Sequence, residues 1–193
     1  IMLNNPSFED ARATGKPPSG WFNCGFAGES PPDVQPGSFS VSRPAQHGNT
    51  YLGMVVRDNE SWEKVGQQLS SPLLRGKCYE MTIQLCHSDT YWSMSQVTRR
   101  STNYDTPVVL RVWGGNGYCI LTEQLAETSP VDHTDWRSYT LKLSPMLSNY
   151  THITFEAYYK KGSLFAYNGN LLTDNASYIR EISCPPPPPA PVV

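Results

Sequence analysis

The chain has 193 residues, of which 17% are charged, and its formal net charge is −2. This length suits one large domain with a buried core, and the weak charge gives no electrostatic reason to expect nucleic acid or an anionic membrane as a partner. No apolar run approaches the roughly 20 residues that a membrane helix needs. Only three apolar residues precede Asn4-Asn5-Pro6, so we expect either a cytosolic protein or the processed form of a secreted one.

The cysteines show none of the spacings that mark zinc sites. They are Cys24, Cys78, Cys86, Cys119 and Cys184. Because their number is odd, at least one is free or pairs outside the chain. Two disulfides, Cys86–Cys119 and Cys24–Cys184, are the pairings that we consider. The alternative is that the thiols are free and buried, which is also a common state of cysteine.

The sequence of the first third of the chain predicts loops that are anchored by single buried aromatic residues. Residues 10–48 are rich in Gly, Pro and Ser, and we interpret them as long ordered loops with short strands, since Pro is excluded from the interior of a sheet. Phe8 is the expected core anchor of the opening segment. Residues 48–56, GNTYLGMVV, predict the first full strand.

Strict alternation of apolar and polar residues is clearest in the segment 62–88. Tyr79, Met81, Ile83 and Leu85 fall on one parity, and polar residues and cysteines fall on the other. Alternation places successive side chains on opposite faces, so this strand buries one face and leaves the other to polar surroundings. Before it, Ser70-Ser71-Pro72 predicts a turn between two strands. This pattern is typical of one sheet of an antiparallel sandwich.

The remaining segments continue the all-β pattern, and we find no convincing helical period. We expect a crossing loop at 89–105 with a short strand near 93–98, a hairpin of 108–113 with 118–121 around Gly114-Gly115-Asn116-Gly117, and strands at 136–143, 152–159 and 171–182. Together these predict an all-β antiparallel sandwich of jelly-roll type, one domain over residues 1–184. Residues 185–193 are proline-rich and predict a stiff linker to a further domain.

Four short motifs, in this order, resemble those of the galactose-binding-like jelly roll that many carbohydrate-binding modules use. They are NPSFE at 5–9, GNTYLG at 48–53, LSSPLLRGKCY at 69–79 and GNLLTDN at 169–175. The run from WEKVGQQL to CHSDTYWS is also similar to the amino-terminal sandwich of modular bacterial outer-membrane and surface proteins, in which a proline-rich or peptidoglycan-associating segment often follows. The resemblance implies a β-sandwich that binds carbohydrate.

The same resemblance implies a structural calcium ion near the join of the first and last strands. Glu9 and Asp174 occupy the matching positions, and Asn49 and Tyr51 are expected to add carbonyl oxygens, because calcium takes six to eight oxygen ligands. The alternative is that the two acids are solvated residues at strand ends or turn caps.

Sugars stack on flat aromatic rings while neighbouring polar groups bind their hydroxyls. The ligand-binding candidates that we select are Tyr91, Trp92, Trp113 and Tyr158, with Trp21 and Tyr118 as further aromatic residues. Tyr158 has the parity opposite to Phe155 and so faces away from the expected core. The alternative is that these rings cap the edges of the sandwich, since aromatic residues are favoured in strands.

Catalytic motifs are absent from the sequence. It contains no GxSxG, HExxH or P-loop pattern, and its acids cannot be paired across a cleft from the sequence alone. This absence predicts a non-catalytic domain, and the resemblance implies that it is an extracytoplasmic carbohydrate-binding-like module of a bacterial surface protein, secreted, on the cell surface or on the periplasmic face of the outer membrane. Its expected partner is a glycan or cell-envelope polysaccharide, without membrane insertion of this domain. The alternative is a structural or adhesive domain that contacts protein, and a hydrolase is a third hypothesis.

Overall fold

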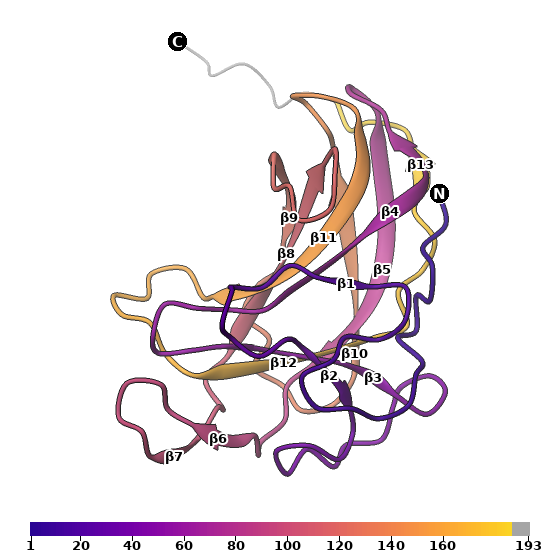
Figure 1. Ribbon diagram of the computed structural model, residues 1–193. Coiled ribbons are helices and arrows are strands. Elements are labelled where there is room, and N and C mark those ends of the chain that lie inside the picture. Colours follow the sequence, from indigo (N-terminus) through magenta and orange to yellow (C-terminus); the bar gives the residue numbers. More distant parts are fainter. Residues whose placement is uncertain (187–193) are drawn as a thin grey trace.

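The computed structural model describes residues 1–186, which form two facing β-sheets and contain no helix (Figure 1). The strands are β1 (Phe22–Asn23), β2 (Asp33–Gln35), β3 (Tyr51–Val56), β4 (Lys64–Leu73), β5 (Cys78–Cys86), β6 (Trp92–Met94), β7 (Ser101–Asn103), β8 (Val108–Gly115), β9 (Glu123–Glu127), β10 (Arg137–Leu143), β11 (Tyr150–Tyr159), β12 (Gly169–Asp174) and β13 (Arg180–Ile182). The predicted all-β antiparallel sandwich is thus confirmed.

One sheet has the order β1-β4-β11-β8-β9, and the other has the order β10-β5-β12-β3-β2 with β13 also paired to β5. Every strand pair in the described residues is antiparallel. A separate small hairpin, β6–β7, projects at the lower left of Figure 1, below the β11–β12 connection. Consecutive strands repeatedly alternate between sheets, which places loops from distant parts of the sequence at the same end of the molecule.

The main core fills the space between the sheets. The alternating residues of β5, Tyr79, Met81, Ile83 and Leu85, are all at most 3% exposed, as their parity predicts. Phe155 on β11 meets Trp21, whose ring centroid lies 5.0 Å away. Aromatic and branched residues of both inner faces therefore hold the sandwich together by burial.

A second, smaller core lies on the outer side of the six-stranded sheet. Tyr51 and Val55 on β3 pack there against Val41, Tyr91 and Tyr104. Val41 belongs to the connection between β2 and β3, and the two tyrosines belong to the connection between β5 and β8. These loops cover that part of the sheet. Loops do not cover the whole outer side of the five-stranded sheet, and this side carries the candidate site.

Two predictions about turns are wrong. Ser70-Ser71-Pro72 lies inside β4, at a shift of the β4–β11 register, and the chain turns instead at residues 74–77, where Gly76 has φ 77°. Proline is tolerated there because this part of β4 has β11 on one side and no second partner on the other. Residues 118–121 are not a strand: β8 pairs with β9, which begins at Glu123.

Both disulfide pairings considered from the sequence are wrong. The disulfides are Cys24–Cys119 and Cys78–Cys184, and Cys86 is a buried free cysteine. The topology explains the second bond, since β13 pairs with the start of β5 and Ile182 lies opposite Cys78. Cys86, at the other end of β5, points into the second core.

Residues 1–186 contain no helix that is long and apolar enough to cross a membrane. They include the whole of the predicted domain, residues 1–184. Of the predicted proline-rich linker, residues 187–193 lie outside the described residues.

Candidate functional site

The outer side of the five-stranded sheet carries a row of alternating charges. Directly paired residues of antiparallel strands point to the same face. Glu156 on β11 lies opposite Lys64 on β4 and opposite Arg111 on β8, and Arg111 lies opposite Glu127 on β9. Trp113 and Tyr158 share this face by the same alternation. We call the surface formed by these six residues the open face.

Glu156 is the centre of the open face and is almost completely enclosed. The residue is only 2% exposed. One carboxylate oxygen, Oε1, accepts the indole N–H of Trp62 at 2.6 Å, and the other, Oε2, accepts the indole N–H of Trp113 at 2.6 Å. Hydrogen bonds to a charged acceptor are short and strong. The carboxylate therefore fixes the orientation of two large flat rings, that of Trp113 on β8 and that of Trp62 just before β4.

A second aromatic ring group continues the face toward the end of β11. Trp62 meets Tyr158 edge to face, with centroids 4.8 Å apart, and meets Phe26 in the same way at 4.8 Å. The Arg111 guanidinium lies over the Tyr158 ring at 3.5 Å, and Arg111 Nε donates to Glu127 Oε2 at 2.6 Å. This end of the face therefore combines exposed ring surface with charged hydrogen-bonding groups.

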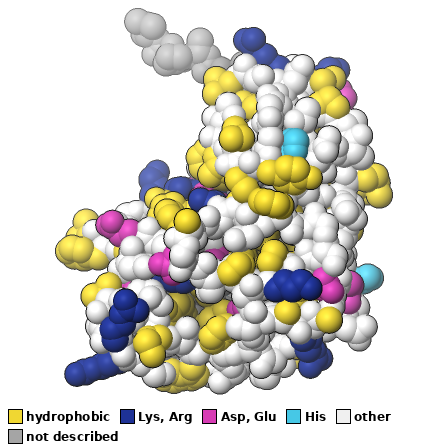
Figure 2. Space-filling view, in the orientation of Figure 1, with side chains coloured by type: hydrophobic (Ala, Val, Ile, Leu, Met, Phe, Trp, Pro, Cys, Tyr) yellow, Lys and Arg dark blue, Asp and Glu magenta, His cyan; other side chains and the backbone are white. Residues whose placement is uncertain are grey.

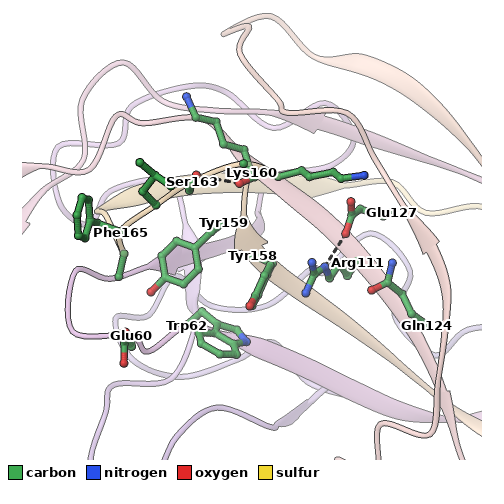
Figure 3. A pocket seen from close by; sticks show the side chains of 14 residues that line it. Glu60, Trp62, Arg111, Gln124, Glu127, Tyr158, Tyr159, Lys160, Ser163 and Phe165 are labelled. Atoms are coloured by element: carbon green, nitrogen blue, oxygen red, sulfur yellow. Dashed lines mark hydrogen bonds and ion pairs between the residues drawn. The ribbon is translucent and has the colours of Figure 1, made fainter.

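A cavity of about 700 Å³ opens beside Tyr158 (Figure 3). Its floor comes from β8, β9 and β11, and its rim comes from residues 160–166 of the β11–β12 connection, which we call the wall. Leu164 and Phe165 in the wall are 88% and 84% exposed. The lining residues are Glu60, Trp62, Arg111, Gln124, Glu127, Tyr158, Tyr159 and residues 160–166. The size is that of an ordinary small-ligand site.

The opposite end of the face is closed by residues 116–122, which we call the strap. The strap joins β8 to β9, yet the Cys24–Cys119 disulfide ties it to the end of β1, on the far side of β11 and β4. On its way Tyr118 meets His152 of β11 at 4.8 Å and Phe22 of β1 at 5.1 Å. The strap thus crosses the face and confines the accessible part to the end near the cavity.

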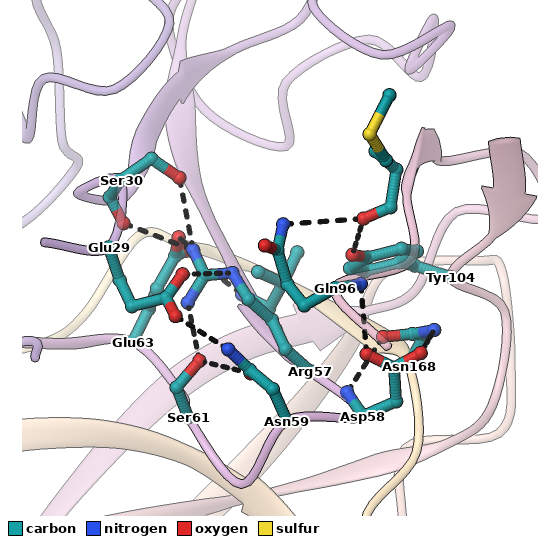
Figure 4. A network of polar contacts seen from close by, with 12 residues as sticks. Glu29, Ser30, Arg57, Asp58, Asn59, Ser61, Glu63, Gln96, Tyr104 and Asn168 are labelled. Atoms are coloured by element: carbon teal, nitrogen blue, oxygen red, sulfur yellow. Dashed lines mark hydrogen bonds and ion pairs between the residues drawn. The ribbon is translucent and has the colours of Figure 1, made fainter. Parts of the chain in front are cut away.

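The turn that presents Trp62 is held by a buried polar network (Figure 4). Arg57 forms an ion pair with Glu63, and its Nη2 donates to the carbonyl and the hydroxyl of Ser30 at 3.0 Å each. The side chains of Arg57 and Glu63 are each only 4% exposed. Since every group of a buried ion pair needs partners, this network fixes the backbone on both sides of Trp62.

The structure brings together two of the four predicted ligand-binding residues. Tyr158 and Trp113 share the open face. Trp92 is 49% exposed but lies on the β6–β7 hairpin, outside that face. The prediction of Tyr91 as a ligand-binding residue is corrected by its burial. Tyr91 is only 3% exposed, its hydroxyl donates a hydrogen bond to Asp33 at 2.6 Å, and burial raises the pKa of its phenol. A ring enclosed in this way has no surface for a sugar.

The other two aromatic candidates, Trp21 and Tyr118, pack against other parts of the chain. Trp21 is 5% exposed in the main core, and Tyr118 belongs to the strap. Sequence reasoning missed Glu156, Arg111 and Trp62. The available signal was parity: in HITFEAYY, Glu156 alternates with Phe155 just as Tyr158 does, and both therefore face outward.

The predicted calcium residues lie around the loop 46–50. Asp174 is fully buried and accepts hydrogen bonds from the backbone N–H groups of Gln46 at 2.8 Å, His47 at 2.9 Å and Asn175 at 2.7 Å, and from the Ser7 hydroxyl at 3.2 Å. Burial raises the pKa of its carboxyl, and these four donors oppose that shift.

Glu9 binds the same loop through the N–H groups of Asn49 and Thr50. The side chain of Tyr51 points away from this loop into the second core, where its hydroxyl donates a hydrogen bond to the Arg43 carbonyl at 2.6 Å. Calcium needs six to eight oxygens, and residues 1–186 hold no cluster of three or more His, Cys, Asp or Glu side chains placed for a metal. The donors around Asp174 occupy the oxygens that a cation would use, so the side chains alone do not make a calcium site, and calcium stays a prediction.

Comparisons with known proteins give fold relatives only. No protein-family model matches the chain, and no curated protein matches it. A solved carbohydrate-binding module of family 16 is 13% identical and has a TM-score of 0.51, with 93% of this chain and 99% of that chain covered. The fold is a galactose-binding-like jelly roll. The jelly-roll sandwich expected from the sequence is thus confirmed as the fold.

Two further solved structures share this fold and have other names. A Stig cyclase of Fischerella sp. TAU, solved in complex with an indole compound, is 14% identical, has a TM-score of 0.56 and matches 94% of this chain and 96% of its own. An arabinose-bound α-L-arabinofuranosidase is 12% identical, has a TM-score of 0.55 and matches 93% of this chain and 26% of its own. At such identities the likeness concerns the fold alone, because one jelly roll hosts binding modules and enzymes.

Proposed function

We propose that this domain is a non-catalytic glycan-binding module and that the glycan lies on the open face. One observation carries the proposal. Trp62, Trp113 and Tyr158 come from three neighbouring strands or their ends to a single face, beside a cavity of about 700 Å³.

The chemistry of this face suits a sugar. The apolar face of a pyranose packs on an aromatic ring, and groups such as Gln124 and Glu127 on the floor of the cavity can bind its hydroxyls. Figure 2 shows a hollow between the upper lobe and the projection at the left, where the β11–β12 connection lies, and hydrophobic, basic and acidic side chains meet there. This mixture favours an amphipathic ligand over a purely apolar one.

The non-catalytic part of the proposal is supported by the state of Glu156. This acid is the one at the centre of the face, it is 2% exposed, and both of its oxygens accept indole N–H groups. A general acid must reach the atom that it protonates, and an acid with 2% of its surface exposed and both oxygens engaged does not reach a ligand on this face. We assign Glu156 the task of holding the rings.

We further propose an extracytoplasmic location, with a glycan or cell-envelope polysaccharide as partner. Two disulfides support the location, because such bonds persist in oxidising compartments and are rare in the cytosol. The resemblance to bacterial surface proteins stays a prediction.

A structural or adhesive role is the second candidate, and one observation favours it. Leu164 and Phe165 project from the wall with 88% and 84% of their surface exposed. A contiguous exposed apolar patch marks a protein contact, and these two adjacent side chains would be part of such a patch. If this role is the true one, the domain binds no glycan and Leu164→Ser with Phe165→Ser abolishes contact with its protein partner.

A glycan-array screen of the intact domain tests the proposal. We expect selective binding that Tyr158→Ala removes and that Trp92→Ala, a matched aromatic removal on the β6–β7 hairpin, leaves unchanged. Circular dichroism of both variants shows whether they fold. Binding that depends on Trp92 and not on Tyr158 would move the site to the hairpin, and an array without any bound glycan would favour the adhesive role.

A further inference from the structure

The Arg111 guanidinium has more hydrogen-bond donors than the structure uses. A guanidinium carries five N–H groups. Its Nε–H is bound to Glu127, while neither Nη group donates a hydrogen bond to any residue of the described chain. The side chain is 22% exposed and lines the cavity. A planar pair of free Nη groups therefore faces the space that a ligand enters.

Tyr158 holds this guanidinium in place. The guanidinium lies 3.5 Å above the ring, and Glu127 fixes its Nε edge at 2.6 Å (Figure 3). Stacking and the ion pair leave little freedom to the side chain, so the Nη edge is presented in one direction before any ligand binds. Such an edge matches the two oxygens of a carboxylate, which an ammonium group cannot match as well.

The other charges around the cavity support an anion. Lys160 and Lys161 in the wall are exposed, and neither forms an ion pair with a described residue. The acids that line the cavity are Glu127, which Arg111 already binds, and Glu60, which is exposed. The cavity thus has three cations against two acids, although the whole chain has a net charge of −2.

We infer that the glycan bound at this site carries an anionic group, a carboxylate or a sulfate ester, which the Nη edge of Arg111 binds in a bidentate manner. The inference rests on the proposed function, since it names the chemical class of the ligand at the same face. Tyr158 then has two tasks: one face of its ring supports the guanidinium that binds the acid, and the ring surface that Arg111 does not cover is left for the sugar.

Calorimetric titration of the full chain with matched ligand pairs tests this inference. The pairs are oligomers of galacturonate, glucuronate and mannuronate, each with its methyl ester, which keeps the backbone and removes the charge. Dextran sulfate and dextran form the sulfate arm and tell which anion is bound. We expect at least one acidic ligand to bind about tenfold to a hundredfold more tightly than its neutral counterpart, as a charged hydrogen-bonded pair contributes.

Two substitutions and one control locate the effect. Arg111→Lys keeps the charge and loses the paired Nη groups, so we expect most of the preference for the acidic ligand to disappear, and Arg111→Ala removes it. Arg180→Ala, which breaks an exposed pair with Glu80 on the other sheet, leaves the preference unchanged. Thermal unfolding of each variant shows that it is folded, and Arg111→Lys remains informative if Arg111→Ala does not fold.

The outcomes separate this inference from the proposed function. Equal affinity for acidic and neutral partners overturns the inference and leaves glycan binding intact. A preference for acid that both Arg111 variants retain, or that Arg180→Ala also loses, overturns it as well. If no glycan of any charge binds, the proposed function itself is wrong.

Discussion

Glu156 accepts the indole N–H of Trp113 at 2.6 Å, and its second oxygen holds Trp62 at the same distance. This relationship links β11 to one ring on the neighbouring strand β8 and to a second ring just before the other neighbouring strand, β4. It also removes the indole N–H groups from the donors that a ligand can use, so the two residues offer mainly ring surface.

Glu156→Gln tests this positioning role. The amide places one N–H group against an indole N–H, so one ring loses its acceptor, and we expect destabilisation by about 1–3 kcal/mol. Near-ultraviolet circular dichroism of the tryptophans should change together with a loss of glycan affinity. Glu127→Gln, at the edge of the same face, is the control and should leave the tryptophan spectrum unchanged. A Glu156→Gln spectrum identical to that of the parent chain would remove the positioning role.

The strap makes a separate prediction. Opening the Cys24–Cys119 bond by a double Cys→Ser substitution should cost about 2–5 kcal/mol of stability and also weaken or broaden glycan binding, because the strap is released from the open face. The matched control is the same double substitution at Cys78 and Cys184. That bond closes a loop of similar length, 106 residues against 95, yet lies away from the face. Denaturation curves and glycan titrations of both variants decide the matter: identical binding would mean that the strap does not shape the site.

The burial of Cys86 predicts how its thiol reacts as the pH changes. Burial raises the pKa of Cys86 to about 12, and only the thiolate reacts with thiol reagents. At pH 8 the native chain should therefore show no reactive thiol, and reactivity should rise only as the pH approaches the raised pKa. Unfolding without reductant should expose one thiol, and unfolding with reductant should expose five. A native thiol that reacts rapidly at pH 8 would contradict the burial of Cys86.

Asp174 makes a prediction that also decides the calcium proposal. Removing this buried acceptor by Asp174→Ala leaves four donors without their partner, and we expect a loss of about 2–4 kcal/mol in denaturant unfolding. If calcium binds there as well, a chelator lowers the Tm of the parent chain, added calcium restores it, and the variant shows neither effect. An unchanged Tm of the parent chain with chelator would contradict a metal site at Glu9 and Asp174.

Much of the sandwich could be predicted from local alternation. The parity of residues 78–86 identified the buried side of β5, and the parity of 152–159 placed Tyr158 on the outer side, because a strand alternates strictly and needs no knowledge of its partners. The same rule, applied to Glu156, would have predicted its place on the open face.

The rest depends on contacts between distant parts of the chain. The strap looks like a hairpin in the sequence, and its path across the sheet involves the bond between Cys24 and Cys119, which are 95 residues apart. Trp62 precedes β4, so its place is set by the buried pair of Arg57 and Glu63 and not by alternation. Tyr91 and Trp92 are neighbours with opposite surroundings, because the loop that covers the second core buries one and leaves the other exposed.

The most direct test of glycan binding on the open face is the NMR spectrum of the tryptophan indole N–H groups during titration with a glycan selected on the array. Glu156 places two of these N–H groups, those of Trp62 and Trp113, beneath the proposed ligand, while Trp92 lies on the β6–β7 hairpin. We expect the Trp62 and Trp113 signals to shift on binding and the Trp92 signal to stay in place. A shift of the Trp92 signal alone would contradict the assignment of the site to this face.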